Sequence, residues 1–331
     1  PMLLDRGFFG WFYTILRPIE AAMAYVIKFF HDVLTAIGLS GAEGLTWSIA
    51  VMLLVVLVKL IILPLFVRQM LSMRKMQALQ PQLQKIQKKY KGKTDRASRE
   101  AMSRETMKVY QDNHANPMGS CVPSLIQGPI FMAMFYTLSA VTYIADGRRG
   151  PLGAFDKAAA QGFSNAQLFN IKLSSTFATA DSGGKVTIGI FVALMCLTMF
   201  YSQWHNVRRN MPKASMQGTA YRTQMLMSFI FPVMYIFSGI TFPFAVLVYW
   251  LTNNIWTLGQ TLWQVYNMPT PGSPAAEAKE KRDYRKEQAR RERAGEISLE
   301  EEELLKAKEA EERLSVEGHQ RKQPSRKKKK K

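Results

Sequence analysis

The sequence predicts an all-α integral membrane protein, with five transmembrane helices around a hydrophilic groove, a cytoplasmic helical hairpin and an N-terminal interfacial amphipathic helix. Three observations predict this class. Of the 331 residues, 47% are hydrophobic and 21% are charged, but the two kinds lie in separate runs, which excludes a single soluble globule. Several apolar runs reach the roughly 20 residues that a helix needs to cross a bilayer. The net charge of +19, which alone would suggest a nucleic-acid or anionic-membrane partner, lies mainly outside those runs.

The apolar runs define the predicted spans. The first run, Trp47–Val67, is interrupted only by Lys59 and Pro64. The last apolar block, 223–266, is too long for one span, and Gly239 and Pro243 mark a break between two helices. The predicted segments are an outer N-terminal segment (1–44), five spans (45–67, 117–145, 185–206, 223–241 and 243–266), a cytoplasmic hairpin (68–116), an outer loop (146–184), a cytoplasmic loop (207–222) and a basic cytoplasmic tail (267–331).

The charges of the connecting segments predict the orientation. Segments 68–116, 207–222 and 267–331 have net charges of +8, +4 and +5, whereas 1–46 has −1 and 144–185 has +2. Cytoplasmic loops of membrane proteins carry the excess of Lys and Arg. The alternation therefore predicts an outer N-terminus and a cytoplasmic C-terminus.

Two readings apply to the apolar segment 18–39, which precedes the first span. It contains Glu20, Lys28, His31 and Asp32. A sixth span would bury charges and break the alternation of loop charge. An amphipathic helix in the outer interface fits these residues better.

The loop after the first span predicts two helices. Apolar residues recur at alternating spacings of three and four, which is typical of a helix–helix seam. These residues are Met76, Leu79, Leu83, Ile86 and Tyr90. Gly92 ends the first helix, and Thr94 is the expected cap of the second. The hairpin has either a structural role only or serves as a docking surface, with Met76, Leu79, Leu83 and Ile86 as its apolar contacts.

Polar residues inside the predicted spans indicate a shared cavity. Lys59 lies about 18 Å along its helix from Trp47, and a cation at that depth costs roughly 2.5 to 3.5 kcal/mol. The alternative is that its long side chain reaches back to the inner interface. Other polar residues lie near mid-depth or toward the inner end, namely Gln127, Ser202, Gln203, Thr252, Asn253 and Asn254. Together they favour a polar cavity open to the cytoplasm over isolated interhelical hydrogen bonds.

The same residues disfavour several function classes. None of the predicted spans contains an acidic residue, which disfavours a proton- or cation-coupled transporter. The four histidines have no metal-ligand spacing, and no hydrolase or nucleotide-binding motif is present. Cys121 and Cys196 both lie in apolar runs. We therefore expect no catalytic residues, no metal and no cofactor, and a protein that is not an enzyme.

Three stretches resemble the YidC insertase family, which has mitochondrial and thylakoid relatives. The first is VKLIILPL followed by RQMLSMRKMQALQPQLQKIQKKY; the second is NPMGSCVPSLIQGPIFMAMFY; the third is LVYWLTNNIWTLGQ in the fifth span. The short outer run LFNIKL is also similar. The resemblance covers about 18–266. A segment like the large outer domain of some bacterial members is not expected in this stretch.

The resemblance implies a membrane protein insertase and chaperone of the bacterial cell membrane. Its groove would open to the cytoplasm and sideways to lipid, with Lys59 at a position where the family usually has Arg. It also assigns Gln127, Tyr249, Trp250 and Asn254 to the groove. Together with Gln203 and Asn253 they form the candidate substrate site.

The expected partners also follow from the resemblance. Nascent membrane proteins would enter at the hairpin and leave sideways along the third and fifth spans, with or without the Sec translocon. The tail would contact the ribosome, since a basic tract binds RNA or anionic lipids. That tract consists of Arg326, Lys327, Lys328, Lys329, Lys330 and Lys331. The alternative functions are a small-solute transporter or channel, and a scaffold for other membrane proteins.

Overall fold

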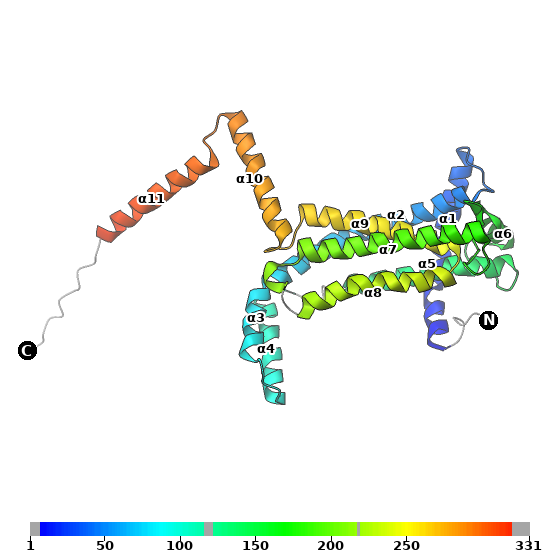
Figure 1. The fold of residues 1–331 in the computed structure, drawn as a ribbon, viewed down its shortest axis with the longest axis horizontal. Coiled ribbons are helices and arrows are strands. Elements are labelled where there is room, and N and C mark those ends of the chain that lie inside the picture. The colour runs from blue at the N-terminus through cyan, green and yellow to red at the C-terminus, as the bar shows by residue number, and fades with distance from the viewer. Residues whose placement is uncertain (1–6, 116–121, 217–218, 320–331) are drawn as a thin grey trace, which may run out of the picture. The chain divides into compact units, whose positions relative to one another are not determined.

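The computed structural model describes residues 7–115, 122–216 and 219–319, and these are almost entirely helical. The chain divides into two units, Pro1–Ala276 and Glu277–Lys331. In the first unit, five long helices run alongside one another (Figure 1). They are α2 (Gly44–Ala78), α5 (Val122–Ala145), α7 (Ser182–Asn210), α8 (Thr219–Thr241) and α9 (Phe244–Asn267).

Four of the described helices are long and apolar enough to cross a membrane: Gly44–Met76, Leu125–Ala145, Ser182–Asn210 and Tyr221–Thr241. The fifth predicted span corresponds to α9, whose middle and C-terminal part contain several amides. Residues 244–250 of α9 are all buried, so the first two turns of this helix are covered by protein. The predicted break near Pro243 is present, because α8 ends at Thr241 and α9 begins at Phe244.

Helix α1 (Gly7–Ala36) begins earlier than the predicted segment 18–39 and continues through Pro18. It runs across the direction of the long helices (Figure 1). Its buried residues recur at helical spacing and pack against α2 and α5. They include Leu16, Met23, Ala24 and Ile27. A crossing helix of this kind fits the interfacial prediction better than a sixth span.

The helical hairpin that follows α2 differs from its prediction in two details. Helix α2 continues to Ala78, and α3 (Gln80–Lys89) starts after a break at Leu79, next to a proline in its first turn. Gly92 adopts φ +84° between α3 and α4 (Arg96–Asp112), as expected for a residue that ends a helix. The predicted cap Thr94 is wrong. Asp95 caps α4 instead, because its carboxylate accepts a 2.8 Å hydrogen bond from the Ser98 N–H.

The segment between α5 and α7 lies at one end of the long helices (Figure 1). It contains α6 (Lys157–Asn165), capped by Asp156, and a hairpin of β1 (Gln167–Leu168) and β2 (Ile171–Lys172). Both turn residues have positive φ, as a tight two-residue hairpin requires. The following chain caps α9. The carbonyls of Ser175 and Leu173 accept hydrogen bonds of 2.8 and 2.9 Å from the first N–H groups of α9, which have no partner within the helix.

The second unit is a pair of charged helices. Helix α10 (Pro274–Ala294) begins just before the unit boundary, and α11 (Leu299–His319) follows Gly295, which has φ +66°. Arg291 joins the two helices through ion pairs with Glu287 on α10 and Glu302 on α11. The predicted tail, 267–331, is therefore helical over most of the part that the structure describes.

Candidate functional site

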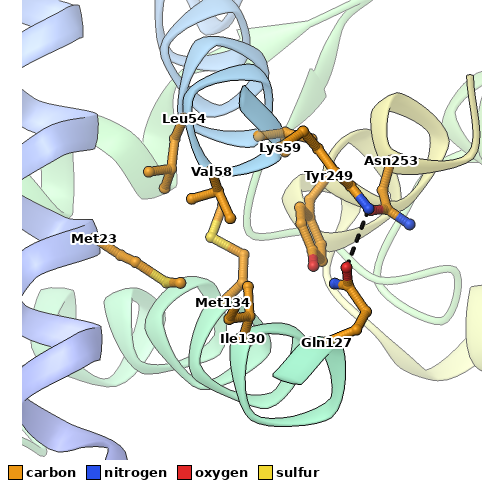
Figure 2. Close-up of a pocket in the computed structure, with 10 residues that line it drawn as sticks. Met23, Leu54, Val58, Lys59, Gln127, Ile130, Met134, Tyr249 and Asn253 are labelled. Atoms are coloured by element: carbon orange, nitrogen blue, oxygen red, sulfur yellow. Dashed lines mark hydrogen bonds between the residues drawn. The ribbon is translucent and has the colours of Figure 1, made fainter. Parts of the chain in front are cut away.

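Lys59 and Gln127 meet at the centre of the candidate site. The Lys59 ammonium on α2 donates a 3.1 Å hydrogen bond to Oε1 of Gln127 on α5 (Figure 2). Each helix is continuous through its site residue. The proline inside each helix follows that residue in the chain, Pro64 in α2 and Pro129 in α5. Both side chains are half-buried. The lysine is therefore directed into the protein and bonded there.

Helix α9 completes this site with Tyr249 and Asn253. The side chain of Asn253 lies beside the ammonium group of Lys59 (Figure 2). Its buried Oδ1 atom has no hydrogen-bond partner. A buried carbonyl oxygen without a partner is costly, so this atom is an acceptor available to a water molecule or a guest.

The remaining lining of the site is apolar. It comes from α1, α2 and α5 and consists of Met23, Leu54, Val55, Val58, Ile130 and Met134. The hollow that these residues enclose measures about 10 Å³, which is space for roughly one water molecule. No carboxylate lies among the ten lining residues, so the cation is bonded to an amide and not neutralised by an acid.

A second, larger hollow lies next to this site. It measures about 400 Å³ and is bounded by α5, α7, α8 and α9. Its lining is aromatic or sulfur-containing: Phe131, Met132, Phe135, Met199, Phe231, Met234, Tyr235, Phe242 and Trp250. The rings of Phe131 and Trp250 stack with centroids 5.4 Å apart. Phe131 and Tyr249 are also in ring contact, which makes the two hollows neighbours.

Sequence reasoning missed this second hollow. The available signal was the pair Phe131 and Phe135 on one face of α5, together with Tyr235 on α8. The expected lateral path along the faces of the third and fifth spans stays a prediction, and these two helices, α7 and α9, pack directly against each other. Ser202 of α7 donates a 3.1 Å hydrogen bond to Thr261 of α9 across that interface.

Comparison with known proteins decides the family. Residues 38–271 match the family model described as 60Kd inner membrane protein. The chain is 57% identical over 330 residues to the membrane protein insertase YidC of Bifidobacterium longum, covering 99% of this chain and 98% of that one. This chain belongs to the YidC insertase family.

Other YidC proteins are more distant. The YidC of Streptomyces avermitilis is 36% identical over 272 residues, covering 78% of this chain and 60% of that one. A crystal structure of an active YidC insertase with its first transmembrane domain resolved is 24% identical, with a TM-score of 0.45. The match covers 74% of this chain and 46% of that chain. Family membership and the apolar helices make the present protein a multi-pass cell-membrane protein.

The structure does not bring all predicted groove residues of this chain together. Lys59, Gln127, Tyr249 and Asn253 line the small hollow, and Trp250 lines the large one. Asn254 is buried between helices, where it accepts a hydrogen bond from Tyr235 and donates one to the carbonyl of Met195. Gln203 lies half-buried on α7 and lines neither hollow.

The hairpin residues predicted as a docking surface also take different positions. Leu79 and Leu83 are buried, which fits a role in stabilising the hairpin itself, and docking through these residues stays a prediction. Met76 and Ile86 are half-buried. The hairpin is further held by Glu105 of α4, which accepts hydrogen bonds from Lys89 and Tyr90. The tail tract from Arg326 to Lys331 lies outside the residues that the structure describes.

Proposed function

We propose that this protein receives nascent membrane proteins in a cytoplasm-facing polar site and releases their apolar segments sideways into the bilayer. The observation that carries the proposal is the position of Lys59. Its ammonium group lies where α2, α5 and α9 meet, bonded to an amide, without a carboxylate among the lining residues and next to a large apolar hollow. One site therefore offers a positive charge and an apolar surface side by side.

The charge would attract the polar or acidic part of the incoming chain. Moving such a segment through hydrocarbon is blocked mainly by its desolvation. A polar site part-way across the membrane shortens the apolar path. Gln127 and Asn253 would supply hydrogen bonds that the segment loses when it leaves water, and the available Oδ1 atom of Asn253 fits this role.

The large hollow would hold the apolar part of the same chain. Its lining from α5 and α8 is aromatic and methionine-rich, a surface that adapts to helices of different sequence. Transfer of that segment to lipid supplies the driving force, at about 25 cal/mol per Å² of apolar surface. The membrane potential adds about 2.3 kcal/mol for each acidic charge moved outward per 100 mV.

The proposed orientation places the N-terminus outside and the C-terminus in the cytoplasm, as the loop charges predict. In this orientation the outer segment covers the outer end of α9. The hairpin and the basic tail then face the cytoplasm, where the ribosome, anionic lipids and the Sec translocon are the proposed partners. No nucleotide is required for the release step, because burial of the apolar segment drives it.

Site-specific crosslinking tests the proposal. A photoreactive residue is placed at Gln127 for the polar site, at Trp250 for the large hollow and at the exposed Leu125 as a matched control on α5. A ribosome-stalled membrane protein should crosslink strongly from Gln127 and Trp250 and weakly from Leu125. Equal crosslinking from all three positions would overturn the proposal. Solute flux through liposomes containing only this protein would favour the transporter alternative instead.

A further inference from the structure

Helix α8 forms one wall of the large hollow and is held mainly by α7. Gly239 allows close approach there, since a Cβ atom at this position would lie 2.2 Å from Cγ2 of Val192. Cys196 of α7 donates a 3.1 Å hydrogen bond to the carbonyl of Pro232. Most side chains of α8 are exposed in the structure. The position of α8 relative to α9 therefore depends on few contacts.

One of those contacts is polar and buried. Asn254 of α9 accepts a 3.3 Å hydrogen bond from the Tyr235 hydroxyl of α8. The same side chain donates a 3.4 Å hydrogen bond to the backbone carbonyl of Met195 on α7. A single amide thus joins three helices at one depth. Its own side chain is only 7% exposed, so water does not compete readily for these bonds.

The hydrogen bond between Tyr235 and Asn254, called the tie below, acts on the wall of the hollow. The Tyr235 ring meets Trp250 edge-on, with centroids 5.5 Å apart, and both rings line the hollow. If the hydroxyl loses its acceptor, the ring must leave Trp250 or carry an unbonded hydroxyl in an apolar environment. Movement of Tyr235 moves the α8 wall with it.

We propose that Asn254 is a positioning residue, which holds Tyr235 and α8 against α9 and so sets the width of the hollow that accepts the departing helix. The inference rests on the function proposed above. The hollow of about 400 Å³ has the size of one turn of a helix about 10 Å wide with a rise of about 5.4 Å per turn. Its width therefore decides how firmly an apolar segment is held.

The expected effect is moderate. Hydrogen bonds between membrane helices shift a two-state equilibrium about threefold on average. Tyr235→Phe removes only the hydroxyl, and Asn254→Leu removes the amide at nearly constant volume. Each change should lower crosslinking of a stalled membrane protein from Met234, in the hollow, about threefold. Crosslinking from Ile130, which lines the Lys59 site, should stay unchanged.

The double variant and matched controls make the test specific. Tyr235→Phe with Asn254→Leu should have the effect of either change alone, because both remove the same bond. Asn254→Asp keeps an acceptor and should restore crosslinking from Met234. Tyr201→Phe removes a hydroxyl from an exposed tyrosine of α7 and should have no effect. An equal loss at Met234 and Ile130, or no loss at either, would overturn the proposal.

A measurement without substrate separates this inference from the proposed function. Met132→Cys and Met234→Cys place one thiol on each side of the hollow, and the single variants detect pairing with Cys196. In vesicles of phosphatidylethanolamine and phosphatidylglycerol, Tyr235→Phe should slow formation of the disulfide about threefold. If this rate changes while the intact protein never crosslinks to a nascent chain, the tie is supported and the proposed function fails. An unchanged rate contradicts the tie.

Discussion

The ammonium group of Lys59 donates a hydrogen bond to the side-chain oxygen of Gln127, 3.1 Å away on the neighbouring helix α5. This bond joins a cation to a neutral acceptor inside the predicted membrane region. An amide orients the charge without cancelling it, whereas a carboxylate would form a closed ion pair. In the proposed mechanism, the positive charge is therefore available to a guest that carries an acid.

Replacement of Lys59 tests the role of the charge. We expect Lys59→Ala to lower the insertion of substrates with an acidic translocated tail about tenfold, equivalent to about 1.4 kcal/mol. Lys59→Arg should retain insertion, because the guanidinium keeps the charge. The measurement is protease protection of a substrate inserted into vesicles. Full activity of Lys59→Ala would remove the charge from the mechanism.

Gln127 gives an independent test of the same charge. Gln127→Glu should pair with Lys59 and neutralise it, so insertion of acidic-tailed substrates should fall several-fold. Gln127→Leu has no charge of its own and should retain much more activity. Both variants are compared in one protease-protection assay. If the two variants behave alike, the hydrogen bond matters and the free charge does not.

Gly44 tests the close approach of α2 to β1. A Cβ atom at Gly44 would lie 2.3 Å from the backbone carbon of Gln167 in β1. Backbone atoms cannot move aside as a flexible side chain does, so Gly44→Ala should destabilise the protein by about 1–3 kcal/mol. Gly189→Ala on α7 is the matched control, because nothing lies within 4 Å of its new methyl group. Thermal unfolding of both variants in detergent makes the comparison, and equal melting temperatures would contradict the close contact.

The position of the polar residues along each helix could be predicted from the sequence better than the direction in which their side chains point. Mid-membrane amides were expected to share one cavity, and Asn253 lies in the small hollow with Lys59. Asn254 has nearly the same depth, but successive helix residues point about 100° apart, so it meets Tyr235 and Met195 instead. Periodicity locates a helix and its apolar face. The rotation of α9 follows from packing against α2 and α7, which no single segment encodes.

Helix caps and contacts between distant segments are also only partly predictable from the sequence. Gly92 is predicted from sequence to end a helix, because glycine adopts positive φ more readily than any other residue. The choice between Thr94 and Asp95 as cap depends on backbone geometry at the turn. The hollow between α5 and α8 depends on residues about one hundred positions apart in the chain, and no spacing rule connects them.

The tail tract gives a prediction about ribosome contact. Removal of residues 268–331 should weaken co-sedimentation with ribosomes, and changing Lys327–Lys331 to Gln should produce much of that loss. Each RNA phosphate contact adds roughly 0.7 to 0.9 to the slope of log affinity against log salt, so the slope should also decrease. Changing five basic residues of α10 to Gln is the matched control. Unchanged binding after truncation would place the contact elsewhere, with the hairpin as the next surface to test.

Glu20 predicts a dependence of stability on pH. This residue of α1 is completely buried, and α1 packs against α5. Burial raises the pKa of Glu20 from 4.5 to about 7, against the opposing influence of the Tyr13 hydroxyl and the guanidinium groups of Arg149 and Arg17. Tyr136 of α5 faces the same carboxyl group.

The sign of the effect follows from proton binding. Between pH 4.5 and about 7 the folded protein holds a proton on Glu20 that the unfolded chain has released, so stability falls as pH rises through this window. Glu20→Gln mimics the neutral acid and should raise the melting temperature at pH 8, while making it less dependent on pH. Glu43→Gln changes an exposed acid of the same outer region and should do neither. The wild-type melting temperature could instead rise from pH 5 to pH 7 in parallel with that of Glu20→Gln. That result would show that Glu20 does not release its proton on unfolding. The packing of α1 against α5 would then depend on other contacts.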